Sequence, residues 1–103
     1  MLFSHESEIL RKLRLIEGLK ADLISSMGEL FQAMAKNSEQ AIREGLAAVV
    51  MACYVLGRRL GVDFAALDEA VMAKVQQKIK QEPEIEQWFG DYSDYQRHLR
   101  QRR

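Results

Sequence analysis

One uncharged stretch, LAAVVMACYVLG from Leu46 to Gly57, most limits what this chain can fold into. Glu44 lies before it, and Arg58 and Arg59 follow it directly. Twelve residues rising about 1.5 Å each span roughly 18 Å as a helix, less than the ~30 Å core of a bilayer. We therefore expect a buried helix of a soluble protein. Small residues would let neighbouring helix backbones approach closely here: Gly45, Ala47, Ala48, Ala52 and Gly57.

Composition and charge narrow the class of protein. The 103 residues suit one domain, and 48% hydrophobic residues with a single proline indicate an ordered core. Lysine plus arginine equals aspartate plus glutamate at 15 each, so nucleic acid is not an expected partner. The only cysteine, Cys53, is expected to be a small buried hydrophobe.

The start of the sequence does not have the pattern of a secretion signal, because Ser4, His5 and Glu6 follow the first three residues. We therefore expect a cytoplasmic protein without a membrane partner.

The first predicted helix covers residues 7–36. Its apolar residues recur at steps of three, four and seven, which is the pattern of one buried helix face. Ser4 or Ser7 is a candidate cap for its start. Gly18 weakens the pattern near the middle, so one bent helix and two shorter helices both remain open.

Two further core helices are predicted over residues 38–60 and 63–81. Asn37 and Ser38 suit a helix end followed by a new N-cap, and so short a connection predicts an antiparallel helical hairpin. The segment 83–103 is predicted to form short helices that dock on the core, with Ser93 capping the last one. The whole chain, 1–103, is therefore predicted to be one all-α domain. The aromatic docking patch would consist of Trp88, Tyr92, Tyr95 and Leu99.

This sequence lacks the residues that most familiar types of catalytic site require. The glycines are isolated, which excludes a glycine-rich phosphate loop. His5 and His98 lie near the two ends without ligand partners at metal spacing, and Cys53 has no basic neighbour in the sequence to activate it as a nucleophile. The remaining possibility is a site on the helical hairpin in which carboxylate side chains act on a phosphate-containing ligand.

Two segments, LISSMGELFQAM and EGLAAVVMACYVLGRRLGVD, resemble the paired helices of the MazG-type all-α nucleoside triphosphate pyrophosphohydrolases. The closer resemblance is to a short bacterial group called MazG-like. It runs from about Leu13 onward through MGELFQA, CYVLGRRLGV and EIEQWFGDYSDYQRHL. The most specific parts are GRRLGVD and EIEQWFGD. This resemblance implies an all-α hairpin fold and a superfamily that acts on nucleoside triphosphates.

The active superfamily carries the signatures Glu-Glu-x-x-Glu on the first long helix and Glu-x-x-Asp on the second. Carboxylates at helical spacing on facing helices hold magnesium ions, which bind the triphosphate and activate the attacking water. In this chain the first two glutamates fall on Ser25 and Ser26, and only the third is kept, as Glu29. The Glu-x-x-Asp pair falls on Gly45 and Ala48, which cannot ligate a metal.

Three carboxylates remain as candidate magnesium ligands if the protein is active. Glu29 is in register, Glu44 lies one residue before the second motif, and Asp22 lies one turn before Ser26. Helix-surface acids are the plainer interpretation of all three. In active relatives the helix that corresponds to 63–81 contributes basic residues to the phosphate pocket, which here implies Lys74 and Lys78. Those lysines also suit the negative end of the helix dipole without any ligand.

Three hypotheses follow from the kept scaffold and the lost signature. The first is a catalytically degenerate MazG-like oligomer that binds a nucleotide or a protein partner without hydrolysis. The second is an active magnesium-dependent pyrophosphohydrolase that uses Asp22, Glu29 and Glu44. The third is an interaction module that binds an acidic partner through its arginine-rich tail, 97–103.

A homo-oligomer is expected on physical grounds. The second helix is apolar nearly all round, and one short third helix cannot cover both of its sides. A second copy would cover it in a four-helix arrangement. The superfamily also assembles as dimers or tetramers, so we expect at least a homodimer. Arg58 and Arg59 flank the apolar stretch and either bind an anion at a subunit junction or simply bound the buried helix with charge.

Overall fold

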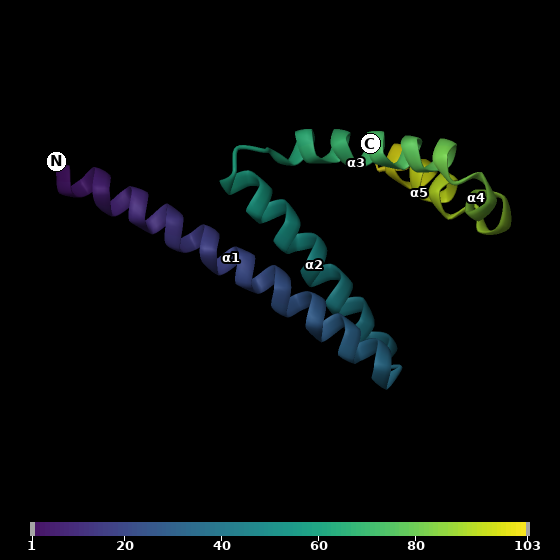
Figure 1. The fold of residues 1–103 in the computed structure, drawn as a ribbon, viewed down its shortest axis with the longest axis horizontal. Coiled ribbons are helices and arrows are strands. Elements are labelled where there is room, and N and C mark those ends of the chain that lie inside the picture. The colour runs from purple at the N-terminus through teal and green to yellow at the C-terminus, as the bar shows by residue number, and fades with distance from the viewer. Residues whose placement is uncertain (1, 103) are drawn as a thin grey trace. The chain divides into compact units, whose positions relative to one another are not determined.

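The structure, a computed structural model, describes residues 2–102 and the side chains of 7–84 and 86–102. The predicted all-α fold class is confirmed, because the described residues form helices joined by short turns and contain no strand (Figure 1). In chain order the helices are α1 (Leu2–Lys36), α2 (Glu39–Arg59), α3 (Phe64–Gln81), α4 (Pro83–Phe89) and α5 (Asp91–Gln101). The chain divides into two compact units, 1–64 and 65–103, and each is described by itself.

The first unit is an antiparallel hairpin of α1 and α2 (Figure 1). The turn between them is short because Asn37 ends α1 in a left-handed conformation and Ser38 caps the start of α2. Asn37 takes the left-handed backbone conformation with φ 55°, and its N–H donates to the Met34 carbonyl at 3.1 Å. Ser38 is the N-cap of α2, and its hydroxyl accepts from the Ala41 N–H at 3.4 Å. Both roles are those predicted from the sequence.

Helix α1 is longer than the periodicity indicated. It begins at Leu2 rather than near residue 7, and it runs through Gly18 as one continuous helix. Ser4 and Ser7 therefore lie inside the helix and do not cap it. The side chains of residues 1–6, including the hydroxyl of Ser4 and the imidazole of His5, lie outside the described part of the chain.

Small residues bring the two helices of the hairpin together. Ala33 of α1 and Gly45 and Ala52 of α2 are buried in the contact. A Cβ built at Gly45 would lie 3.1 Å from the Leu30 Cα and 3.2 Å from its Cβ, closer than ordinary van der Waals contact. The predicted close approach of helix backbones is therefore present, and Gly45 is the residue that allows it.

The expectation that the whole apolar stretch is buried is wrong for the single chain. Only part of the surface of α2 lies against α1, and much of the rest is open to solvent. There Leu46 is 51% exposed, Val50 55% and Met51 64%. Cys53 is also exposed, which corrects the prediction that it is a buried hydrophobe.

Helix α2 as a whole has a longer apolar span than its uncharged core indicates. By length and composition alone, this 21-residue helix could cross a membrane. Only 11% of its 18-residue apolar segment is buried. A core helix of a soluble protein meets the same criterion, so this property is weak evidence of a membrane span.

The second unit contains α3, α4 and α5. Val75 of α3 is its buried apolar residue among those described. Gly90, with φ 66°, separates α4 from α5 and acts as the N-cap of α5 without a side-chain hydrogen bond. The prediction that Ser93 caps the last helix is therefore wrong, because α5 already begins at Asp91.

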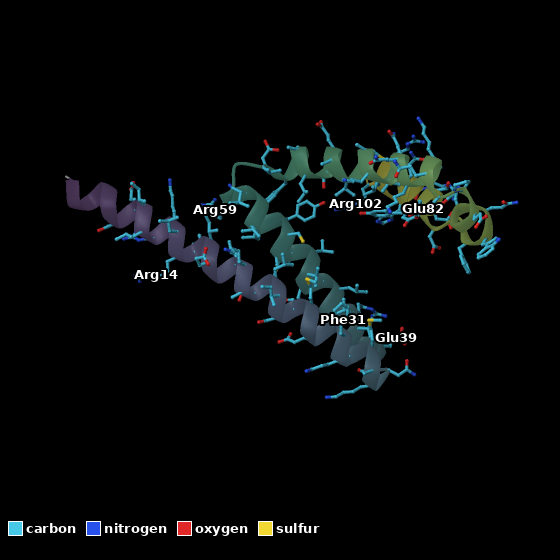
Figure 2. The ribbon with its side chains drawn as sticks, in the orientation of Figure 1. Arg14, Phe31, Glu39, Arg59, Glu82 and Arg102 are labelled. Atoms are coloured by element: carbon cyan, nitrogen blue, oxygen red, sulfur yellow. The ribbon has the colours of Figure 1, made fainter. Side chains whose placement is uncertain are left out.

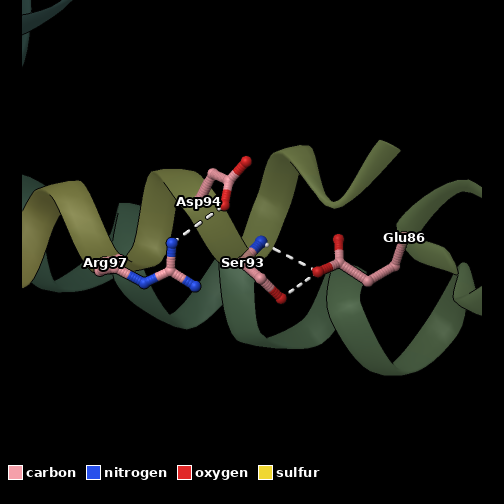
Figure 3. A network of polar contacts seen from close by, with 4 residues as sticks. All are labelled: Glu86, Ser93, Asp94 and Arg97. Atoms are coloured by element: carbon pink, nitrogen blue, oxygen red, sulfur yellow. Dashed lines mark hydrogen bonds and ion pairs between the residues drawn. The ribbon is translucent and has the colours of Figure 1, made fainter. Parts of the chain in front are cut away.

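Ser93 instead ties α5 to α4 (Figure 3). Its N–H donates to Glu86 Oε1 at 3.1 Å, and its hydroxyl donates to the same oxygen. On the same helix, Arg97 Nη1 donates to Asp94 Oδ1 at 3.1 Å. Trp88 of the predicted docking patch is 72% exposed within its unit. Docking of the segment 83–103 on the hairpin remains a prediction.

Candidate functional site

A hollow with a volume of about 350 Å³ lies between α1 and α2, and we call it the hairpin hollow. This volume is within the range of small-molecule sites. Its α1 side carries the polar groups and its α2 side is apolar. The lining residues are Leu19, Asp22, Ser25, Ser26 and Glu29 of α1 with Ala48, Met51, Ala52 and Val55 of α2.

The polar groups of the hairpin hollow come from one row along α1. Asp22 and Glu29 are seven residues apart, which is about 10.5 Å of helix rise, and Ser25 and Ser26 lie between them. The row therefore offers two separated carboxylates and two hydroxyl groups. The facing wall of α2 contributes alanine, methionine and valine side chains, which contact a ligand only through van der Waals and hydrophobic interactions.

The resemblance to the superfamily aligned four positions without a carboxylate to its signatures; three of them lie in this hollow, and the fourth lies in the helix contact. Ser25, Ser26 and Ala48 line the hollow and supply no carboxylate. Gly45 is buried against Leu30, so this position is used for packing.

The structure brings two of the three predicted carboxylates together and leaves the third apart. Asp22 and Glu29 share the hairpin hollow, whereas Glu44 is not among its lining residues. Glu44 is exposed and accepts a hydrogen bond from Gln40 Nε2 at 3.2 Å.

The donor set does not match the metal site of the active superfamily. Within the described residues, no group of three or more histidine, cysteine, aspartate or glutamate side chains is placed to hold a metal ion. Asp22 and Glu29 stand two helical turns apart rather than as the adjacent carboxylates of the signature. The assignment of magnesium ligands to Asp22, Glu29 and Glu44 stays a prediction.

The predicted phosphate-binding lysines line a separate hollow in the second unit, also of about 350 Å³, which we call the C-terminal hollow. Lys78 Nζ forms an ion pair with Glu82 at 3.0 Å. The hydrogen bond and the negative charge of Glu82 raise the pKa of Lys78 above its usual value. Lys74 lies one turn earlier on the same face. The other lining residues are Leu67, Ala70, Val71, Val75, Tyr92 and Tyr95.

Sequence reasoning missed one cationic residue that joins a cluster. Lys12 of α1 lines a small hollow together with Arg58 and Arg59 of α2. The two arginines stood out because they follow the apolar stretch. Lys12 could have been found by aligning α1 antiparallel to α2 from the turn at Asn37, because residues near 12–16 then face the end of α2.

Comparison with known proteins identifies the family of this chain. Neither a search of curated proteins nor a search of solved structures gives a match. The model of the MazG-like family matches residues 9–92, which include the hairpin from residue 9 onward, α3 and α4. The chain therefore belongs to the MazG-like family, a helical family similar to the nucleoside triphosphate pyrophosphohydrolases.

Proposed function

We propose that this protein is a catalytically degenerate member of its family that binds a nucleotide in the hairpin hollow without hydrolysing it. One observation carries the proposal. Gly45, at a signature position, is buried against Leu30, so the position that would supply a metal ligand holds the two helices together. The other lost positions, Ser25, Ser26 and Ala48, form the surface of a hollow of ligand size.

The chemistry of the hollow favours a nucleotide over a protein segment. The apolar wall formed by Ala48, Met51 and Val55 suits the face of a base. Asp22 and Glu29 accept hydrogen bonds from sugar hydroxyl or base amino groups. Their negative charges oppose a bare phosphate at this place, so the base and sugar are the parts that bind here.

We further propose that two copies pair through the exposed face of α2. Leu46 and Val50 are exposed there one helical turn apart, with Met51 at the edge, and burying them against a second hairpin would complete a four-helix core. Met51 also lines the hairpin hollow, so the second copy would cover the rim of the ligand site. A helical protein of this composition, with its apolar face covered in the dimer, would reside in the cytoplasm.

Hydrolysis and binding are tested separately. Pyrophosphate release is measured for a panel of canonical and modified nucleoside triphosphates, with and without magnesium, and we expect none above background. Calorimetry with nucleosides and nucleotides should show binding that does not require magnesium. Glu29→Gln and Asp22→Asn should each weaken that binding about tenfold, because each removes a hydrogen bond to a charged group.

Glu17→Gln is the matched control, because Glu17 lies on α1 outside the hollow and pairs with Lys20. Magnesium-dependent pyrophosphate release that Glu29→Gln abolishes would instead establish the active enzyme. Absence of any nucleotide binding, together with capture of an acidic partner that is lost when 97–103 are deleted, would favour the interaction module.

Sedimentation equilibrium at micromolar concentration tests the dimer. The wild-type protein should sediment with at least twice the mass of one chain. Val50→Glu should give the mass of one chain, because a charge is buried in the apolar face. Gln77→Glu, an added charge at an exposed position of α3, should leave the mass unchanged. A monomeric wild-type protein would contradict the dimer.

A further inference from the structure

Three cationic side chains from two helices converge on one small hollow near the open end of the hairpin, which we call the basic hollow. Lys12 and Ile16 contribute from α1, and Arg58 and Arg59 from the last turn of α2, with Gly61 closing the rim. The volume is about 230 Å³, and none of the lining residues is acidic. Figure 2 shows Arg59 at the end of α2 that lies away from the hairpin turn.

One of the three cations is held in position. The guanidinium carbon of Arg58 lies 5.2 Å from the centre of the Phe64 ring, in a cation–π contact. Phe64 in turn packs edge-on against Tyr54, with 6.0 Å between ring centres. An arginine with fewer accessible orientations loses less entropy when it binds an anion, so its fork of donors is partly preorganised.

The neighbouring hollow on α1 makes a useful contrast. It contains Arg11 and Arg14 but also Asp22, whose charge offsets one of the two arginines. In the basic hollow no carboxylate plays this part. Arg43 of α2, in contrast, forms an ion pair with Glu39 at 3.2 Å. Three like charges that share one hollow repel each other, and an anion with several charges relieves that repulsion.

We propose that the basic hollow is a binding site for a polyphosphate group, with Arg58 and Arg59 contacting phosphate oxygens through their donor forks and Lys12 supplying a third charge. Arginine matches phosphate geometry with paired hydrogen bonds. A volume of 230 Å³ admits a short chain of phosphates and leaves little room for a base beside it. The site shares no lining residue with the hairpin hollow, so it does not rest on nucleotide binding there.

Inorganic tripolyphosphate is the direct probe, titrated into the 103-residue protein by calorimetry at low salt without magnesium. Saturable binding with one site per chain is expected. Lys12→Gln and Arg59→Gln should each weaken it about tenfold, which is the effect of losing one charged hydrogen bond. Arg58→Lys keeps the charge and loses the fork, so it should weaken binding less than Arg59→Gln. Binding should fall steeply as sodium chloride rises to 0.5 M.

Arg43→Gln is the matched control, because it also removes one positive charge from α2 but lies far from the hollow in sequence and pairs with Glu39. Circular dichroism of every variant checks that the helices are intact. A nucleoside triphosphate that binds no tighter than tripolyphosphate, with the same dependence on Lys12 and Arg59, also supports the site. The proposal is overturned if tripolyphosphate shows no saturable binding, or if Arg43→Gln weakens binding as much as Lys12→Gln and Arg59→Gln.

Discussion

The two units of this chain bring helices together in different ways. In the hairpin, α1 and α2 approach through residues with little or no side chain, and the Leu30 backbone lies directly over Gly45. In the second unit, α3 and α5 line a common hollow through larger side chains, such as Lys78 of α3 and Tyr92 and Tyr95 of α5. Helix contact in the hairpin therefore requires residues with small side chains, whereas the second unit requires large side chains to fill the space between its helices.

This difference explains where each unit keeps space for chemistry. Close backbone packing at Gly45 places the hairpin hollow beside the contact, along the flank of α1 that carries Asp22 and Glu29. In the second unit the space lies between the helices themselves, over Val75. Substitutions that add volume should damage the hairpin most, and substitutions that remove volume should damage the second unit most.

Gly45→Val should have the largest effect. Its first side-chain atom meets the Leu30 backbone at about 3.1 Å, and backbone cannot move aside as a flexible side chain can. We expect a loss of about 3 kcal/mol in the free energy of unfolding, measured by urea denaturation followed by circular dichroism. Gly28→Ala is the control, because nothing lies within 4 Å of its added carbon, and it should stabilise the helix by about 0.5–1 kcal/mol. Equal behaviour of the two variants would refute the packing role of Gly45.

Val75→Ala should have the next largest effect and should act on the second unit. Val75 is 5% exposed, and removing its two methyl groups leaves a gap beneath the C-terminal hollow, which should cost about 2 kcal/mol. Urea denaturation followed by circular dichroism measures this loss in the free energy of unfolding. Val62→Ala, at a position 39% exposed, should change stability by less than about 0.5 kcal/mol. A similar loss in both variants would contradict the assignment of Val75 as a core residue.

Ser38→Ala should have the smallest effect of the three. It removes the acceptor for the Ala41 N–H at the start of α2, and loss of such a cap costs about 1 kcal/mol. Thermal unfolding should show a lower midpoint for this variant, and Ser38→Asp should restore it because aspartate also caps helices. An unchanged midpoint in Ser38→Ala would mean that Asn37 and the helix contact fix the turn without the cap.

Local chemistry made much of the fold predictable. Apolar periodicity identified the core helices, and the preferences of Asn37 and Ser38 located the turn that makes the hairpin. The start of α1 was missed because Ser4 and Ser7 are good caps in isolation, yet the helix continues past them to Leu2. A capping preference of about 1 kcal/mol is too weak to stop a helix whose extension is otherwise favourable.

Burial and cross-helix neighbours were harder to predict. An apolar sequence shows that residues avoid water in the final assembly, but it does not say whether the same chain or a second copy covers them. This is why Cys53 was expected to be buried and is exposed in the single chain. The meeting of Lys12 with Arg58 depends on the register of the two helices, which no short motif reports. The sharing of one hollow by Asp22 and Glu29 followed more readily, because both lie on α1.

The contact at Gly45 also limits what a single substitution could add to this chain. A glutamate at position 45 would begin with the same Cβ that the Leu30 backbone excludes, so a carboxylate placed there would first separate the helices. An acid at this position would therefore require a compensating change around Leu30.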